Sequence, residues 1–281
     1  MISTNIVGYL GPRGTHSEDV CSNYYLEKKW TFQPYSTIDT CIRAVASGDI
    51  QECIVPIENS LEGSINITLD TLAHEVDLYI QKEVVWQIHN HLLTKSVNEE
   101  IHTIVSHAQP LAQCRHYLTK HYPSAQLKAV ESTVEAVRIV ASGAKNHAAI
   151  ANINASKLYN MNVLARDIQD HPQNCTRFVI LGRQPLEYAK GDYKTSIVCR
   201  IRGDKPGSLF HLLQELATNN INLVRIESRP ARTELGEYIF FMDMEGNITD
   251  ANVQCALKAL KQKSLWFKNL GSYIVCKNNI L

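Results

Sequence analysis

Three consecutive residues, Thr176, Arg177 and Phe178, place a hydroxyl group, a permanent cation and an aromatic ring side by side. They follow the polar stretch 170–175 and precede the apolar run 179–181. This order predicts a loop that delivers polar side chains to the start of a buried strand, where binding and catalytic residues are common. Because neighbours in an extended segment point to opposite sides, Thr176 and Phe178 could share one face of a cleft while Arg177 turns away or reaches around its rim. The structural alternative is a capping threonine beside a surface arginine.

Polar residues also follow predicted strands that end at Leu10, Ile57 and Val105. In sheets built from strand–loop–helix repeats, ligands bind beyond the carboxyl ends of the strands, so these positions are candidate binding sites. After Leu10, the glycine turn 11–14 and a capping box at 15–18 suit a small carboxylate, and the glycine spacing differs from that of a dinucleotide site. The candidate residues after the second and third strands are Glu58, Asn59, Ser60, Ser106, His107 and Gln109.

The composition limits the partners and the compartment. A chain of 281 residues with 44% hydrophobic residues suits two domains with ample cores. The 28 basic and 28 acidic residues cancel, which predicts neither a nucleic-acid nor a membrane partner. Eight cysteines without a Cys-x-x-Cys pair, no signal peptide and no apolar run of ~18 residues predict a soluble cytoplasmic protein with reduced thiols. His89 and His91 alternate on one predicted strand, but no third ligand lies nearby in the sequence, so no metal site is predicted.

The order of the predicted elements divides the chain into two parts. Strand–loop–helix repeats run through the first part, which favours parallel sheets. Residues 184–194 are predicted to be a linker. The second part has the order βαββαβ, the split βαβ arrangement of a four-stranded antiparallel sheet. Its predicted strands cover residues 195–202, 222–229, 237–243 and 267–275, and its predicted helices cover residues 208–219 and 250–262.

In its motifs, the chain resembles a prephenate dehydratase along nearly its whole length. The matching segments are Gly8–Thr15, Val55–Ser60 with Glu62 and Gly63, Ser106–Gln109 with Ala112–Cys114, and Thr176–Phe178. The C-terminal part resembles an ACT domain in the segments Asp204–Leu209 and Glu227–Pro230. Two positions depart from the pattern: His16 stands where the family commonly has Phe, and Ser208 stands where the ACT motif usually has Ala.

The resemblance implies an α/β fold with two domains. The expected catalytic domain, residues 1–183, is built like a type-2 periplasmic binding protein, with two lobes that close on a cleft. Its lobes would be about residues 1–78 plus 166–182, and residues 79–165. After the linker 184–194, residues 195–281 would form a ferredoxin-like ACT regulatory domain.

The resemblance also implies a reaction, the decarboxylation and dehydration of prephenate to phenylpyruvate in phenylalanine biosynthesis, without cofactor or metal. In the family the threonine of the triplet helps the hydroxyl group to leave, which assigns this role to Thr176. Either Glu58 or His107 would be the second proton source, and both remain open. Arg177 is expected to bind a substrate carboxylate, and Phe178 to form an apolar wall. The neutral donors expected around the substrate are Asn59, Ser60, Ser106 and Gln109.

Each of these assignments has a structural alternative. Asn59 and Ser60 could only shape a turn, and Gln109 could cap a helix. His107 could be a surface residue. Phe178 could be a packing residue of the core.

The ACT domain in such enzymes binds phenylalanine at a subunit interface and inhibits catalysis, and the enzymes are usually dimers or tetramers. The matching residues in this chain are Gly207, Ser208, Leu209, Glu227, Ser228, Arg229 and Pro230. Three other functions remain open. The enzyme could prefer arogenate to prephenate, it could decarboxylate prephenate without expelling the hydroxyl group, or the chain could be a non-catalytic amino-acid sensor on the same scaffold.

Overall fold

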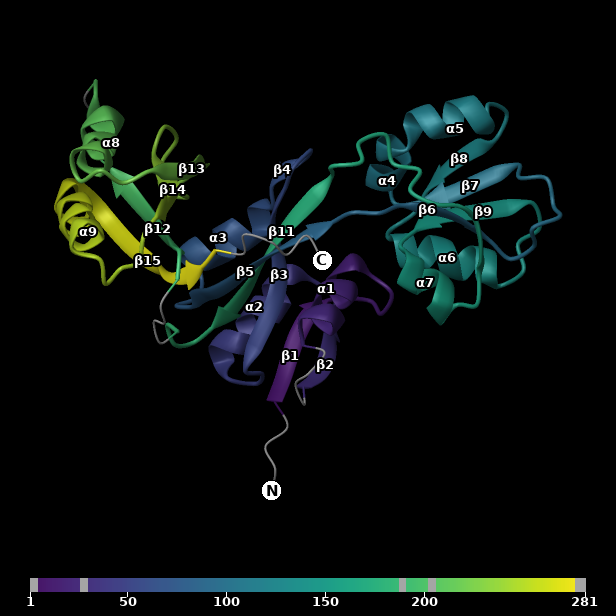
Figure 1. The fold of residues 1–281 in the computed structure, drawn as a ribbon, viewed down its shortest axis with the longest axis horizontal. Helices are drawn as coiled ribbons and strands as arrows, with labels where there is room; N and C mark the ends of the chain where they lie inside the picture. Colours follow the sequence, from purple (N-terminus) through teal and green to yellow (C-terminus); the bar gives the residue numbers. More distant parts are fainter. Residues whose placement is uncertain (1–4, 26–29, 187–190, 202–205, 276–281) are drawn as a thin grey trace.

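The computed structural model describes residues 5–25, 30–186, 191–201 and 206–275, and shows a mixed α/β protein (Figure 1). A central lobe lies between a second lobe, called here the distal lobe, and a C-terminal domain. Parts of the predicted linker (187–190), of the predicted ACT motif (204 and 205) and of both termini lie outside the described residues. None of the helices in these described ranges combines the length and apolar character that a membrane span requires.

The largest sheet runs through both the central lobe and the C-terminal domain, in the order β13-β14-β12-β15-β5-β11-β3-β1-β2, with β4 paired to β3. In the central lobe, β1 pairs in parallel with β2 and β3, whereas β11 pairs antiparallel with β3 and β5. The sheet is therefore mixed. Within the central lobe, the predicted parallel arrangement holds for β1, β2 and β3. The strands of the central lobe are β1 (Asn5–Leu10), β2 (Trp30–Tyr35), β3 (Glu52–Asn59), β4 (Gly63–Ser64), β5 (Tyr79–Gln87) and β11 (Cys175–Gly182).

Three helices cover the two faces of the central sheet: α1 (His16–Tyr24), α2 (Ile38–Ser47) and α3 (Asn66–His74). The start and end of α2 follow directly from the sequence, because the Thr37 side chain accepts from the Thr40 N–H and Gly48 takes the left-handed conformation at the end. Apolar residues of α2 and α3 pack with Val179 and Leu181 of β11 on one face. On the other face, α1 packs with Phe178 and Ile180.

The distal lobe has its own sheet, in the order β10-β6-β9-β7-β8. Its strands are β6 (His91–Thr94), β7 (Thr103–Ser106), β8 (Gln126–Ala129), β9 (His147–Ala151) and β10 (Asn162–Ala165). Its helices are α4 (Ala108–Gln113), α5 (Arg115–His121), α6 (Thr133–Ala141) and α7 (Ile153–Leu158). The small-residue strand β9 lies in the middle with Ala148, Ala149 and Ile150 fully buried, because helices pack on both of its faces.

The chain crosses between the two lobes twice, after β5 and before β11. The predicted boundary at residue 78 is wrong for the first crossing. Strand β5 pairs along its length with β11, so residues 79–87 belong to the sheet of the central lobe. The central sheet is completed only when the chain returns from the distal lobe as β11, and β5 carries no local signal for the lobe that it joins.

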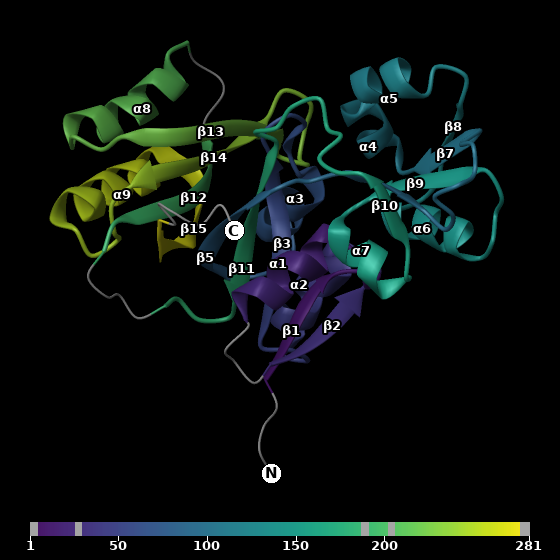
Figure 2. The same cartoon turned by 45° about the vertical axis from the view of Figure 1, so that its right-hand side comes forward.

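The C-terminal domain has the predicted βαββαβ order. Its elements are β12 (Tyr193–Ile201), α8 (Ser208–Thr218), β13 (Leu223–Pro230), β14 (Tyr238–Glu245), α9 (Ala251–Lys263) and β15 (Ser264–Ile274). Helices α8 and α9 cover the face of this sheet that is turned away from the central lobe (Figure 2). The other face packs Phe241, Leu270 and Tyr273 into the same core as α2 and α3. The domain is therefore joined to the central lobe by a continuous apolar core.

Gly271 allows β15 to lie against β5 where the two parts of the large sheet meet. Its φ is +111°, and a Cβ added there would lie 2.7 Å from the carbonyl oxygen of Ile80. A side chain at this position would therefore meet both backbone strain and a backbone atom that cannot move aside.

We predict that Gly271→Ala lowers the thermal midpoint of unfolding more than Gly143→Ala does. Gly143 has a φ of +100° but no atom within 4 Å of its added Cβ, so it reports the backbone strain alone. That strain costs about 1–3 kcal/mol at either position, and Gly271→Ala adds the overlap with Ile80. Differential scanning calorimetry of the two full-length variants measures the difference. Equal losses would contradict the proposed close approach.

Candidate active site

Thr176 is the second residue of β11 and lies in the strand, not in a loop before it. Its side chain is buried, and its Oγ1 accepts a hydrogen bond of 2.9 Å from the Nδ2 amide of Asn59, the residue directly opposite on β3. A hydroxyl group has one hydrogen and two acceptor lone pairs. With one lone pair bound by Asn59, the hydroxyl group can still donate its own hydrogen. This orientation suits a hydrogen-bond donor to a substrate oxygen.

Asn59 is held in place by contacts on both ends of its amide. The Oδ1 atom accepts from the backbone N–H groups of Leu61 (2.9 Å) and Glu62 (3.0 Å), which shapes the turn after β3. The Nδ2 atom also lies 3.0 Å from Asn174 Oδ1 and 3.2 Å from the carbonyl oxygen of Cys175. Asn59 therefore shapes the turn, which was the structural role considered for it, and it also orients Thr176.

Two further amides extend this chain of contacts and were not assigned a role from the sequence. Asn174 Nδ2 donates to Gln113 Oε1 at 3.2 Å, and Gln113 Nε2 lies 3.4 Å from Glu62 Oε1. Gln113 belongs to α4 of the distal lobe, so the contacts connect the two lobes at Thr176. The motif match around Gln113 was the only signal in the sequence, because buried amides that bind one another have no characteristic spacing.

An extra residue in β3 decides which side chains face Thr176. Arg177 pairs with Glu58 and Phe178 pairs with Pro56, which leaves Ile57 as a bulge. A regular ladder would place Glu58 opposite Thr176. The bulge instead moves Glu58 to the opposite face of the sheet and brings Asn59 to the face of Thr176.

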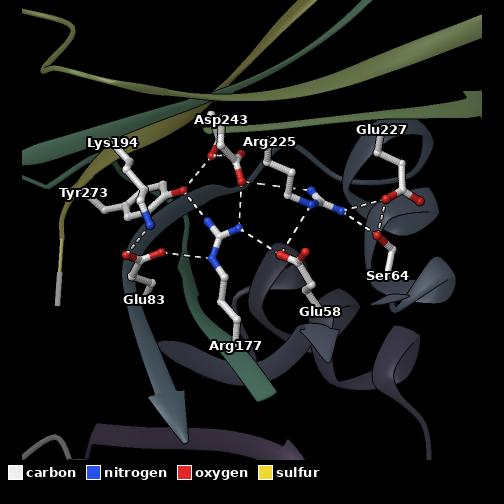
Figure 3. Close-up of polar contacts among 10 residues, drawn as sticks. Glu58, Ser64, Glu83, Arg177, Lys194, Arg225, Glu227, Asp243 and Tyr273 are labelled. Carbon is white, nitrogen blue, oxygen red and sulfur yellow. Dashed lines mark hydrogen bonds and ion pairs between the residues drawn. The ribbon is translucent and has the colours of Figure 1, made fainter. Parts of the chain in front are cut away.

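Arg177 and Glu58 consequently face the C-terminal domain (Figure 3). The guanidinium of Arg177 donates to Glu83 (2.9 Å), Asp243 (2.6 Å) and the hydroxyl group of Tyr273 (2.6 Å). Burial acts to lower the pKa of Arg177, but Tyr273, Asp243 and Glu83 outweigh it, so that the pKa is raised and the group stays charged. These contacts correct two expectations. The side chain of Arg177 is bound by the protein's own acceptors, on the sheet face opposite to that of Thr176. The side chain of Glu58 also lies on that opposite face and does not contact the threonine.

Phe178 is buried in the core that α1 forms with the central sheet, on the same face as Thr176. This position agrees with the alternative that Phe178 is a packing residue of the core. Ser60 lies at the turn after β3, where its Oγ accepts from the Cys175 N–H at 3.0 Å. Ser60 is exposed, and its Oγ lies 3.5 Å from Asn174 Oδ1.

The residues predicted in the distal lobe lie at the end of β7. Ser106 is fully buried and its Oγ donates to the carbonyl oxygen of Ile150 at 2.7 Å, so it holds β7 and β9 together. His107 is exposed and caps α4, with its Nδ1 accepting from the Gln109 N–H at 3.4 Å. The side chain of Gln109 is half-buried. Of the two proposed proton sources, His107 is the one that does not face the C-terminal domain.

A buried carboxylate joins α1 of the central lobe to α7 of the distal lobe. Asp19 accepts from Asn152 Nδ2 (2.8 Å) and Asn154 Nδ2 (2.5 Å). Burial raises the pKa of Asp19 to about 7, although the hydrogen bond from Asn154 acts in the opposite direction. A groove of about 570 Å³ opens beside this contact, lined by residues that include Arg13, Glu18 and Lys157.

Three histidines lie near this lobe junction. Burial lowers the pKa of His16 to about 4, and the nearby rings of His91 and His89 act in the same direction. His89 Nδ1 lies 2.6 Å from an oxygen of Asp167, and His91 Nδ1 accepts from the Asp167 N–H at 3.1 Å. Within the described ranges, no three His, Cys, Asp or Glu side chains are grouped to hold a metal ion.

The predicted regulatory segment of β13 has two faces. Glu227 and Arg229 are turned toward the central lobe, where the Ser64 hydroxyl group donates to Glu227 and Arg229 pairs with Asp70 at 2.9 Å. Ser228 and Pro230 point to the other side and are exposed. The segment 207–209 begins α8, with Gly207 at a φ of +85°. Within β13, Glu227 and Arg229 therefore lie on the face opposite to Ser228 and Pro230.

Comparisons with known proteins cover nearly the whole chain. A family model described as prephenate dehydratase matches residues 7–186, and one described as ACT domain matches residues 195–262. Prephenate dehydratase of Methanocaldococcus jannaschii is 39% identical over 271 residues, which are 95% of this chain and 97% of that protein.

Among solved structures, prephenate dehydratase of Arthrobacter aurescens in complex with L-Phe has a TM-score of 0.87 at 33% identity, over 96% of this chain and 90% of that one. GqqA, a novel type of quorum quenching acylase, has a TM-score of 0.85 at 26% identity, over 97% and 99% of the two chains. Because the same fold carries different chemistry, the reaction has to be argued from the site.

We predict that Asp19 makes the unfolding temperature depend on pH. The folded-state pKa of about 7 lies above the ordinary value of 3.8, so its favourable contribution is complete below about pH 4 and is lost as the pH rises through 7. Asp19→Asn cannot ionise. The thermal midpoint of this variant relative to the wild type should therefore rise between pH 5 and pH 8, which calorimetry at a series of pH values measures. A constant difference across this range would show that Asp19 is ionised in the folded protein.

Proposed function

Because this chain belongs to the prephenate dehydratase family, we propose that it converts prephenate to phenylpyruvate, carbon dioxide and water. It would then be a carbon–oxygen lyase of phenylalanine biosynthesis. The observation that carries the proposal is the hydrogen bond from Asn59 to Thr176, which leaves the threonine hydroxyl group free to donate to the departing oxygen. Arogenate is the alternative substrate, because it shares the ring and the leaving group.

The reaction breaks two bonds of the substrate ring. The carboxylate leaves as carbon dioxide, its bonding electrons enter the ring, and the carbon–oxygen bond at the opposite ring position breaks. The departing hydroxide takes up one proton and becomes water, and aromatisation supplies the driving force. The enzyme therefore has to assist the leaving oxygen, a contribution worth roughly 10²–10⁴-fold for a well-placed acid or donor.

Thr176 is proposed to give this assistance as a positioned hydrogen-bond donor. A threonine hydroxyl group is too weak an acid to give up its proton completely, so a second group must supply the proton. We assign this role to His107, which is exposed at the start of α4 in the distal lobe. Glu58 is less suited, because its carboxylate is paired with Arg177 and Arg225 on the opposite face of the sheet.

The substrate carries carboxylates, and the site offers neutral donors for them. Ser60 in the central lobe and Gln109 in the distal lobe have partly or fully exposed side chains. Asn59 and Ser106 are engaged within the protein and act by holding the site in shape. No residue of this proposal requires a metal or a cofactor.

We further propose that L-phenylalanine binds the C-terminal domain and inhibits the reaction. The support is the relative from Arthrobacter aurescens, which was solved in complex with L-Phe, and the match of residues 195–262 to the ACT domain. A homodimer or homotetramer is the expected assembly.

The seven cysteines within the described residues are free, which fits the reducing cytoplasm.

Incubation of the purified full-length protein with prephenate at neutral pH tests the activity. Formation of phenylpyruvate, detected by its absorbance in alkali, and its suppression by phenylalanine are expected. A non-aromatic keto acid would instead identify a decarboxylase. Phenylalanine binding without turnover of prephenate or arogenate would identify a sensor.

We predict that Thr176→Val lowers kcat by roughly 10²–10⁴-fold and leaves KM for prephenate within a few-fold, because the donor acts on the leaving oxygen in the transition state. Valine keeps the size and the branched shape of threonine, so packing is preserved. Thr176→Ser retains the hydroxyl group and should keep a larger share of kcat. Steady-state kinetics of the two variants measure this difference, and near-normal turnover by Thr176→Val would refute the role.

A further inference from the structure

The two strands that carry the candidate site also carry the residues that bind the C-terminal domain. On β3, Asn59 faces Thr176 and the preceding Glu58 faces the C-terminal domain. On β11, Thr176 faces Asn59 and the following Arg177 faces the C-terminal domain. Each site residue is thus one peptide bond away from a residue that the other domain holds.

The contacts on that side form an interdomain ion cluster, shown in Figure 3. The central lobe contributes Arg177 together with Glu58 and Glu83, and the C-terminal domain contributes Lys194, Arg225, Glu227 and Asp243. Glu83 accepts from Arg177 on one oxygen and from Lys194 on the other, both at 2.9 Å. Except for Glu58 and Glu227, the acidic members are nearly inaccessible to solvent, so each depends on its partners.

Asp243 of β14 is the acceptor at the centre of this cluster. Its carboxylate accepts from Arg177 Nη1 at 2.6 Å and from Ser196 Oγ at 2.5 Å. Burial acts to raise the pKa of Asp243, but Arg177, Ser196 and Arg225 outweigh it, so that the pKa is lowered and the group is ionised. Tyr273 completes the contact, because its hydroxyl group is bound to both Arg177 and Ser196.

Arg225 of β13 is shared between the two domains. Its Nε lies 3.4 Å from Glu58 and its Nη1 lies 4.0 Å from Asp243. Its Nη2 donates to Ser64 at 2.6 Å and to Glu227 at 3.0 Å. One planar guanidinium with fixed donor directions cannot keep all of these partners if β13 moves relative to the central lobe.

We propose that Arg225 and Arg177 are positioning residues through which the C-terminal domain controls Asn59 and Thr176. A shift of β13 or β14 changes the contacts of Glu58 and Arg177, and the strands transmit it to the site residues on their other face. Glu227 and Arg229 are on the strand face that is bound to the central lobe, so a ligand that displaces β13 acts on these contacts directly. The inference rests on the proposed function, since it concerns regulation of that site.

The test is Arg225→Gln in the full-length protein. Loss of the charge should leave KM for prephenate within twofold, lower kcat about threefold or more, and raise the half-inhibitory phenylalanine concentration at least tenfold. Phenylalanine binding, measured by titration calorimetry, should persist. Arg225→Lys keeps the charge and should recover part of the inhibition.

Arg232→Gln is the matched control. Arg232 also links the two domains, through Asp70 at 3.0 Å and Glu75 at 3.4 Å, but its partners lie on and next to α3 and not on β3 or β11. This variant should keep kcat and phenylalanine inhibition within twofold of the wild type. Equal loss of inhibition in both variants would mean that loosening the domains in general is enough, and would overturn the inference.

Other outcomes separate this inference from the proposed function. Unchanged inhibition in Arg225→Gln, or joint loss of inhibition and of phenylalanine binding, overturns the inference and leaves the dehydratase assignment intact. A wild-type protein that turns over prephenate but is not inhibited by phenylalanine would also overturn the inference and leave the dehydratase assignment intact. A wild-type protein without turnover would refute both the inference and the dehydratase assignment. If Arg225→Gln does not fold, Glu58→Gln tests the same link from the central lobe and should show the same loss of inhibition.

Discussion

The pairing of β3 with β11 is the contact on which both the site and its link to the C-terminal domain depend. The bulge at Ile57 shifts the register of this pairing by one residue. As a result, Asn59 contacts Thr176 on one face of the sheet and Glu58 pairs with Arg177 on the other. A regular ladder would place Glu58 opposite Thr176 and Ile57 opposite Arg177, and would leave the Thr176 hydroxyl group without its amide donor. One additional residue in a strand therefore separates the polar groups of the site from the charges that hold the neighbouring domain.

The charges between the domains determine how the two domains are placed relative to each other more than they determine the free energy of unfolding. Buried ion pairs often contribute little net free energy, because desolvation offsets their attraction, whereas removal of one partner leaves an uncompensated charge at a cost of about 3–5 kcal/mol. Arg177 has ion or hydrogen-bond partners on both domains, so the cluster favours a single relative placement of the two sheets. The apolar core around Phe241 and Tyr273 supplies the burial that brings these charges together.

Much of the fold could be predicted from the sequence, because its signals are local. The βαββαβ order of the C-terminal domain and the start and end of α2 follow from periodicity and from capping residues. The short edge strand β8 was not predicted, and β5 was assigned to the wrong lobe. The exposed residues of β8 carry no apolar pattern, and the place of β5 depends on its pairing with the distant β11.

The chemical types needed at the site were determined by the sequence alone, since a threonine donor, amides and a histidine are properties of the residues at 176, 59, 109 and 107. Their partners were decided only by the tertiary structure. Arg177 was expected beside the substrate and is bound to Asp243 instead. Asn174 and Gln113 join the contacts around Thr176, and the motif match at Gln113 was the only sequence signal for either of them. The physical reason is that the direction of a side chain depends on strand register and on the elements packed against it, and both arise from contacts between residues far apart in the chain.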